Sequence, residues 1–111
     1  MHKLYKLALT FPALEGCPTS GDVLGTGRFE PAEFAEWAAR QNMSPGGVWA
    51  ALFILSVWND RNDWAAAGLD MVTRTGGAYP VGRFHMHDAL GTWDPAHRAA
   101  FAAWTADAWW C

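Results

Sequence analysis

The fold of this chain is decided by one stretch, residues 44–58: Ser44-Pro45-Gly46-Gly47-Val48-Trp49-Ala50-Ala51-Leu52-Phe53-Ile54-Leu55-Ser56-Val57-Trp58. It is the only long run without a charged side chain. Pro45 suits the first helical position, because its missing N–H would have no intrahelical acceptor there, and Ser44 can cap it. Apolar side chains on both faces then predict a buried central helix over about 45–58. The polar residues 59–63 mark its end.

A repeated opening predicts two further helices. Glu30-Pro31-Ala32 places a proline near the first helical position and carboxylates in the first turn, where the helix dipole favours negative charge. The helix that follows leads into the central one, so residues 31–58 should form a helical hairpin. Asp94-Pro95-Ala96 repeats the opening and predicts a last helix over about 95–107. The predicted inner stripe of the earlier helix is Phe34, Trp37, Ala38 and Gln41.

The remaining segments are less regular. Residues 1–11 fit both helical and strand spacing, and we favour a helix. Asp63 can cap a helix over 64–72, and residues 83–90 predict a short helix that ends at Gly91. Its inward positions would be Phe84, Met86 or His87, and Leu90.

Glycines and prolines predict long loops at residues 16–27 and 73–82. The second of these could instead be a hairpin that turns at Gly76-Gly77. The fold class is therefore all-α, a single compact domain over residues 1–111 with four to five helices around the central one.

Composition points to a partner without naming it. Hydrophobic residues make up 51% of the chain and charged residues only 17%, so much of the surface must be uncharged. The net charge of −3 predicts no direct binding to nucleic acid or to an anionic membrane. Cys17 and Cys111 are too few for a disulfide framework, and the apolar run Leu7 to Leu14 is interrupted by Pro12 and too short for a signal peptide. These observations predict a cytoplasmic setting.

Tryptophan is the outlier of the composition, with eight residues. Each ring can bury about 150–250 Å², so most of them should build the core of a small domain, while others could anchor an interface. Trp109 and Trp110 are adjacent and cannot both be buried on one helix face. The predicted interface residues are Trp64, Tyr79, Trp109 and Trp110, with Glu33 and Glu36 on the outer face of the helix at 31–41.

Chemistry-bearing residues are sparse. His85, His87 and Asp88 form the strongest cluster, but on a helix the two histidines lie about 200° apart and would not converge on a metal ion. Cys17 stands between Gly16 and Pro18 without a surrounding motif. We therefore predict no catalytic residue, no metal and no cofactor.

The leading hypothesis is a small acidic protein-binding module without enzymatic activity. It would be an inhibitor or adaptor of the kind that phages and mobile elements direct against host machinery, as anti-CRISPR proteins are. One alternative is a small enzyme or metal-binding protein that uses His85, His87 and Asp88. The other is a structural protein that associates with copies of itself as a homo-oligomer.

Overall fold

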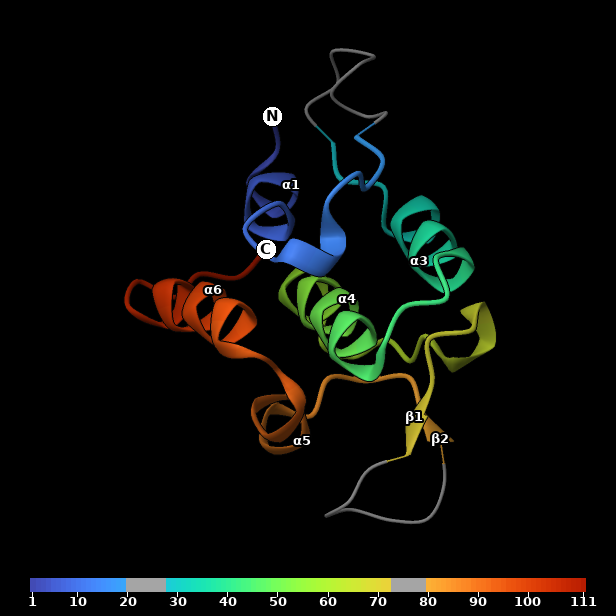
Figure 1. The fold of residues 1–111 in the computed structure, drawn as a ribbon. Coiled ribbons are helices and arrows are strands. Elements are labelled where there is room, and N and C mark those ends of the chain that lie inside the picture. Colours follow the sequence, from blue (N-terminus) through green and yellow to red (C-terminus); the bar gives the residue numbers. More distant parts are fainter. Residues whose placement is uncertain (20–27, 73–79) are drawn as a thin grey trace.

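The structure is a computed structural model that describes residues 1–19, 28–72 and 80–111. Figure 1 shows the helices α1, α3, α5 and α6 arranged around the central helix α4. The radius of gyration is 13.1 Å, as expected for a compact chain of this length. The predicted all-α domain is confirmed. The described elements are α1 (Lys3–Ala8), η1 (Pro12–Leu14), α3 (Pro31–Arg40), α4 (Pro45–Trp58), η2 (Ala65–Ala67), β1 (Met71–Val72), β2 (Pro80–Val81), α5 (Met86–Thr92) and α6 (Pro95–Thr105), where η denotes a 3-10 helix.

Helix α4 begins and ends where the sequence predicts. Pro45 occupies its first turn, and Ser44 precedes it in an extended conformation without a side-chain capping bond. The start is therefore set by the proline and the backbone. The helix contacts α1, η1, α3 and α5, so it is covered on several sides, which is why it needs apolar residues all round.

The core is an aromatic cluster centred on Phe53 of α4, which is 1% exposed. Contacts between aromatic rings at this spacing stabilise the fold by more than the burial of their apolar area alone. The cluster joins α4 to α6 and to the residues that flank η1 and α5. The neighbouring ring centres lie 5.0 to 6.4 Å from that of Phe53 and belong to Trp104, Phe101, Phe84, Phe11 and Trp93.

The eight tryptophans divide between the core and its edge. Trp49, Trp93 and Trp104 are buried, and Trp110 is 60% exposed. The other four are partly buried and pack against the core: Trp37, Trp58, Trp64 and Trp109.

Helices α1 and α3 meet through Tyr5. Residues 3–8 are helical, which confirms the preference for a helix near the start of the chain. The buried Tyr5 hydroxyl accepts a hydrogen bond from the Glu30 N–H at 3.0 Å and so positions the start of α3. In α3, Phe34 and Ala38 face inwards as predicted, but Gln41 is exposed and Ala35 is buried instead.

The predicted helix over residues 64–72 is wrong. Asp63 does accept a hydrogen bond from the Ala65 N–H at 2.9 Å, but the turn that it opens is the short 3-10 helix η2. Gly68 follows with a φ of 98°, which ends the turn. Met71 then pairs with Val81 in an antiparallel arrangement, so Pro80 and Val81 of the predicted second loop form a strand. The predicted turn at Gly76-Gly77 and residues 20–27 of the predicted first loop lie outside the described residues.

The last two helices differ from their predicted bounds. Helix α5 begins at Met86 and continues through Gly91 to Thr92, so Gly91 does not end it. Met86 and His87 are exposed, and the buried positions are Asp88 and Ala89. Helix α6 begins at Pro95 as predicted but ends at Thr105, two residues before the predicted end. None of the helices within residues 1–19, 28–72 and 80–111 has the length and apolar character needed to cross a membrane.

Candidate functional site

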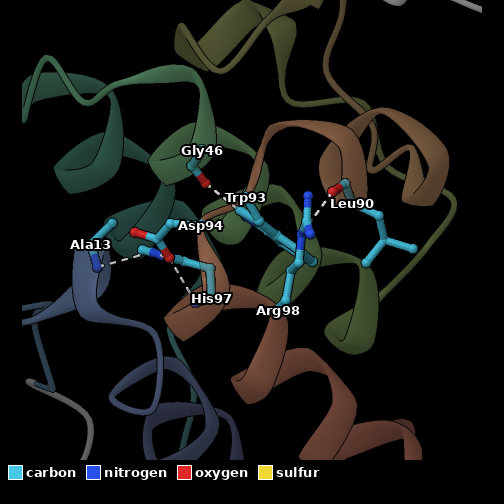
Figure 2. A network of polar contacts seen from close by, with 7 residues as sticks. All are labelled: Ala13, Gly46, Leu90, Trp93, Asp94, His97 and Arg98. Carbon is cyan, nitrogen blue, oxygen red and sulfur yellow. Dashed lines mark hydrogen bonds and ion pairs between the residues drawn. The ribbon is translucent and has the colours of Figure 1, made fainter.

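A network of polar contacts joins the start of α6 to η1 (Figure 2). One carboxylate oxygen of Asp94 accepts a hydrogen bond from the His97 N–H at 2.9 Å and contacts His97 Nδ1 at 2.8 Å. His97 Nε2 accepts from the Ala13 N–H at 3.2 Å. Because Nε2 accepts, these bonds place the ring proton that faces Asp94 on Nδ1.

An aspartate and histidine pair of this kind can act as a general base only where Nε2 faces a substrate. Here Nε2 is occupied by the Ala13 N–H, and His97 is 7% exposed. The bonds from His97 also hold the pKa of Asp94 below its usual value. The pair therefore joins the start of α6 to η1.

The same corner of the molecule is fastened by two further side chains. The indole N–H of Trp93 donates to the Gly46 carbonyl at 2.9 Å, and the Arg98 Nε–H donates to the Leu90 carbonyl at 3.1 Å. Figure 2 shows both bonds beside the Asp94 and His97 pair. The first bond ties the junction between α5 and α6 to the start of α4, and the second ties α6 to α5.

The histidines of the predicted chemical cluster do not converge. His85 is half-buried just before α5, and its ring lies edge-on to that of Trp49 with centres 6.1 Å apart. His87 is exposed, and the buried Asp88 lines a different hollow from His85. In the part of the chain that the structure describes, no three His, Cys, Asp or Glu side chains lie close enough to hold a metal ion.

Burial affects the pKa of both cysteine thiols. Cys17 is buried, and burial raises the pKa of its thiol. Cys111 is exposed, but partial burial also raises the pKa of its thiol. A raised pKa lowers the fraction of thiolate, which is the reactive form.

The predicted interface residues fall on three different surfaces. Glu33 and Glu36 are exposed on α3. Trp64 and Trp110 line one cavity, although they are 46 positions apart in the sequence. Trp109 lies elsewhere, between α1 and α6, and Tyr79 lies outside the described residues. The sequence therefore named residues that the fold separates.

Trp64 carries an unusual polar atom. Its indole N–H is buried and has no hydrogen-bond partner among the residues that the structure describes. A donor left in this state costs about 1–3 kcal/mol. Its ring packs against that of Trp58 with centres 6.1 Å apart, so the side chain is held by packing alone.

Trp109 lies in an open groove, which we call the α1–α6 groove. Its volume is about 510 Å³. Figure 1 shows the C-terminal tail passing close to α1 and α6. The groove is lined by Lys3, Lys6, Leu7 and Thr10 from α1 and the residues after it, by Ala100, Ala103 and Trp104 of α6, and by Asp107 and Trp109.

The floor of the α1–α6 groove is apolar and its edges are charged. Leu7, Ala100 and Trp104 are each at most 9% exposed and form the floor. The Lys3 ammonium lies 4.7 Å from the centre of the Trp109 ring, a distance typical of a cation–π contact. The Trp104 indole N–H donates to the Trp109 carbonyl at 3.2 Å, which anchors the tail in the groove.

The outer face of α6 extends the groove. Within residues 95–105 the only charged side chain is Arg98, which is held by the Leu90 carbonyl. The remaining exposed face is almost wholly alanine, at positions 96, 99, 102 and 103. Small side chains allow the backbone of a neighbouring helix to approach closely.

Sequence reasoning missed the charged edge of this groove. Lys3 and Lys6 are three residues apart, so one helical turn places them on the same side of α1. The spacing of the two lysines is visible in the sequence, but it indicates a shared face only once residues 3–8 are known to be helical. The facing alanines of α6 gave no signal, because they occur equally in buried helices.

Comparisons with protein families, with characterised proteins and with solved structures found no match to this chain.

Proposed function

We propose that this chain is a protein-binding module without enzymatic activity, and that its α1–α6 groove receives one amphipathic helix of a partner protein. The observation that carries the proposal is the groove itself. It has an apolar floor, two lysines on one edge and a face of small residues on the other. Binding of an amphipathic helix in an apolar groove is a common mode of protein recognition.

The shape of the groove supports a helix as the bound element. Ala100 and Ala103 are one turn apart on α6 and leave room for the partner's backbone. The half-buried Trp109 offers an apolar face to large side chains of the partner, and the buried Trp104 lies in the floor beside it. A single helix that presents an apolar stripe would cover this floor.

The charges support an acidic stripe beside the apolar one. The chain carries a net charge of −3, but Lys3 and Lys6 make the α1 edge of the groove locally positive. Over the Debye length of about 8 Å at physiological salt, these local charges outweigh the distant ones. Acidic side chains of the partner would therefore face Lys3 and Lys6, and a basic one would face Asp107.

Within this class, we propose an inhibitor or adaptor that acts on host machinery, in the manner of anti-CRISPR proteins. Its support is the small size of a chain that carries an open apolar groove, and the absence, among residues 1–19, 28–72 and 80–111, of three His, Cys, Asp or Glu side chains placed to hold a metal ion. A protein of this kind acts by occupying a surface of its target, and it needs no chemistry of its own.

Site-specific photocrosslinking tests the groove. A photoreactive amino acid replaces Ala103 in the groove, and a matched variant carries it at Met86, which is 55% exposed on α5. In lysate of the host cell, a partner should crosslink at position 103 and not at position 86. Equal crosslinking at both positions, or none at 103, would contradict the proposal. A crosslink to a second copy of this chain would favour the homo-oligomer instead.

Charge reversal tests the partner's chemistry. The crosslinked segment is made as a peptide, and its dissociation constant is measured for the parent and for Lys3→Glu with Lys6→Glu. Loss of two ion pairs should weaken binding about tenfold. A peptide with its acidic residues changed to lysine should recover affinity for the double variant. Arg40→Glu on α3 is the matched control and should bind like the parent.

A further inference from the structure

A second hollow, which we call the Trp64 cavity, lies beside the C-terminal half of α4. Its volume is about 500 Å³. Its walls are α4, residues 59–64 after it, residues 82–85 between β2 and α5, and Trp110 of the C-terminal tail. No residue of the α1–α6 groove lines this cavity, so the two sites are separate. The cavity has the size of a site for a small ligand.

Two walls of the Trp64 cavity are fastened to each other. The backbone N–H of Trp64 donates to the Gly82 carbonyl at 2.8 Å. Arg83 donates through Nη2 to the Arg61 carbonyl at 3.2 Å, and its Nε lies 3.9 Å from a carboxylate oxygen of Asp63. The cavity is therefore formed before a ligand arrives, which reduces the ordering that binding would require.

Four polar side chains line the cavity and carry hydrogen-bonding groups that no described residue engages. Asn59 uses its amide oxygen to accept the Arg61 N–H at 3.0 Å, and its amide NH₂ donates to no described residue. The Asp60 carboxylate, the Asn62 amide and the His85 ring have no hydrogen-bond partner within the described ranges. The cavity thus offers carboxylate and amide acceptors together with amide and imidazole donors.

Three aromatic rings supply flat apolar faces beside these polar groups. Trp64 and Phe84 are half-buried in the walls, and Trp110 is 60% exposed at the rim. The Trp110 ring is supported from behind, because it meets the buried Trp104 ring edge-on with centres 5.2 Å apart. An aromatic face held in this way can stack against a flat ligand.

The charges of the cavity nearly cancel. Asp60 is negative and Arg83 is positive, and Arg83 is already held by Asp63 and the Arg61 carbonyl. No excess positive charge remains to attract a phosphate or a carboxylate. A neutral ligand is favoured, with groups that donate and accept at once and with an apolar face for the rings.

Hydroxyl groups meet the first requirement, since each both donates and accepts, and the C–H face of a sugar ring meets the second. We propose that the Trp64 cavity binds a neutral polyhydroxylated ligand, one or two sugar residues of a glycan. Asp60, Asn59, Asn62 and His85 would hydrogen-bond the hydroxyls, while Trp64 and Trp110 would stack on the ring. This site is independent of the proposed helix-binding groove.

Nuclear magnetic resonance of ¹⁵N-labelled full-length protein tests the proposal. The probes are the methyl glycosides of glucose, galactose, mannose and N-acetylglucosamine, each titrated into the protein. At least one should shift the indole N–H signals of Trp64 and Trp110 saturably, and leave that of Trp109 in place. Absence of a shift with all four probes would overturn the proposal, as would saturable binding of adenosine at the same signals with no response to any glycoside.

Two variants tie such binding to the cavity. Asp60→Ala and Trp110→Ala should each raise the dissociation constant about tenfold, the effect of one charged hydrogen bond or one stacked ring. Asp70→Ala is the matched control, because Asp70 is exposed and does not line the cavity. Equal affinity in all three variants and the parent would place the sugar elsewhere and overturn the assignment. Lys6→Glu, in the α1–α6 groove, should leave sugar binding unchanged.

Discussion

The Lys3 ammonium lies 4.7 Å from the centre of the Trp109 ring, so the first helix of the chain and its C-terminal tail hold each other. Two hydrogen bonds fix the same tail, from the Trp104 indole N–H to the Trp109 carbonyl and from the Cys111 N–H to the Val57 carbonyl. The tail is therefore part of the folded domain, with the Trp109 ring docked and the Trp110 ring largely exposed.

Removal of the docked ring should destabilise the protein. Trp109→Ala should lower the free energy of unfolding by about 1–3 kcal/mol, because a half-buried ring loses its contacts with α1 and α6. Trp110→Ala should cost less, since that ring is 60% exposed. Thermal unfolding followed by circular dichroism measures both. Equal melting temperatures of the parent and Trp109→Ala would show that the tail does not contribute to stability.

Truncation of the central aromatic side chains should have the largest effect. Phe53→Ala and Trp49→Ala should each cost about 3–5 kcal/mol, because both side chains are at most 2% exposed and leave a cavity in the core. Urea unfolding measures the decrease in the free energy of unfolding. If Phe53→Ala does not fold, the smaller change Phe53→Leu can be measured in its place. Leu9→Ala is the control, since Leu9 is 44% exposed. A similar midpoint for Phe53→Ala and Leu9→Ala would be incompatible with this core.

Two glycines should respond to alanine in opposite directions. A Cβ on Gly82 would overlap the backbone nitrogen of Ala65, so Gly82→Ala should force the wall of the Trp64 cavity apart and destabilise the protein. Gly91 lies in α5 with nothing within 4 Å of a new Cβ. Gly91→Ala should therefore stabilise the protein by about 0.5–1 kcal/mol. The melting temperatures of the two variants test this prediction. A change of the same sign in both variants would contradict it.

The Asp94 carboxylate should make stability depend on pH. Hydrogen bonds from the His97 N–H and ring hold its folded-state pKa below the unfolded value. Its contribution is therefore complete above the unfolded pKa, and it is lost as the pH falls through the lower, folded pKa. Unfolding free energies of the parent and Asp94→Asn, which cannot titrate but can still cap α6, should converge at acidic pH. A constant difference across the acidic range would contradict this linkage.

Metal content tests the alternative built on the histidines. We expect no stoichiometric transition metal in the purified protein, because a protein zinc site needs at least three converging ligands, and no three His, Cys, Asp or Glu side chains of the described residues lie close enough to hold an ion. Elemental analysis of the parent and of His85→Ala with His87→Ala provides the measurement. One equivalent of metal that disappears in the double variant would revive the metal-binding hypothesis.

The sequence by itself determined the helical framework. Residues 45–58 carry no charge and begin with proline, so only a helix covered by other elements could accommodate them. An acidic residue likewise precedes α3 and α6, and a proline with a fixed φ begins each of them, which is why both starts were predicted. These features act within about one helical turn, so they can be predicted from residues that are close in the sequence.

Only the tertiary structure decided the irregular segments and the two sites. Residues 64–72 have helix-forming alanines, yet pairing of Met71 with Val81 and the bond from Trp64 to Gly82 hold them in a turn and a strand. Trp64 and Trp110 meet at one cavity, and Lys3 meets Trp109, through contacts between residues 46 and 106 positions apart. Such contacts depend on how the helices pack around α4. That packing cannot be inferred from the spacing of residues that are close in the sequence.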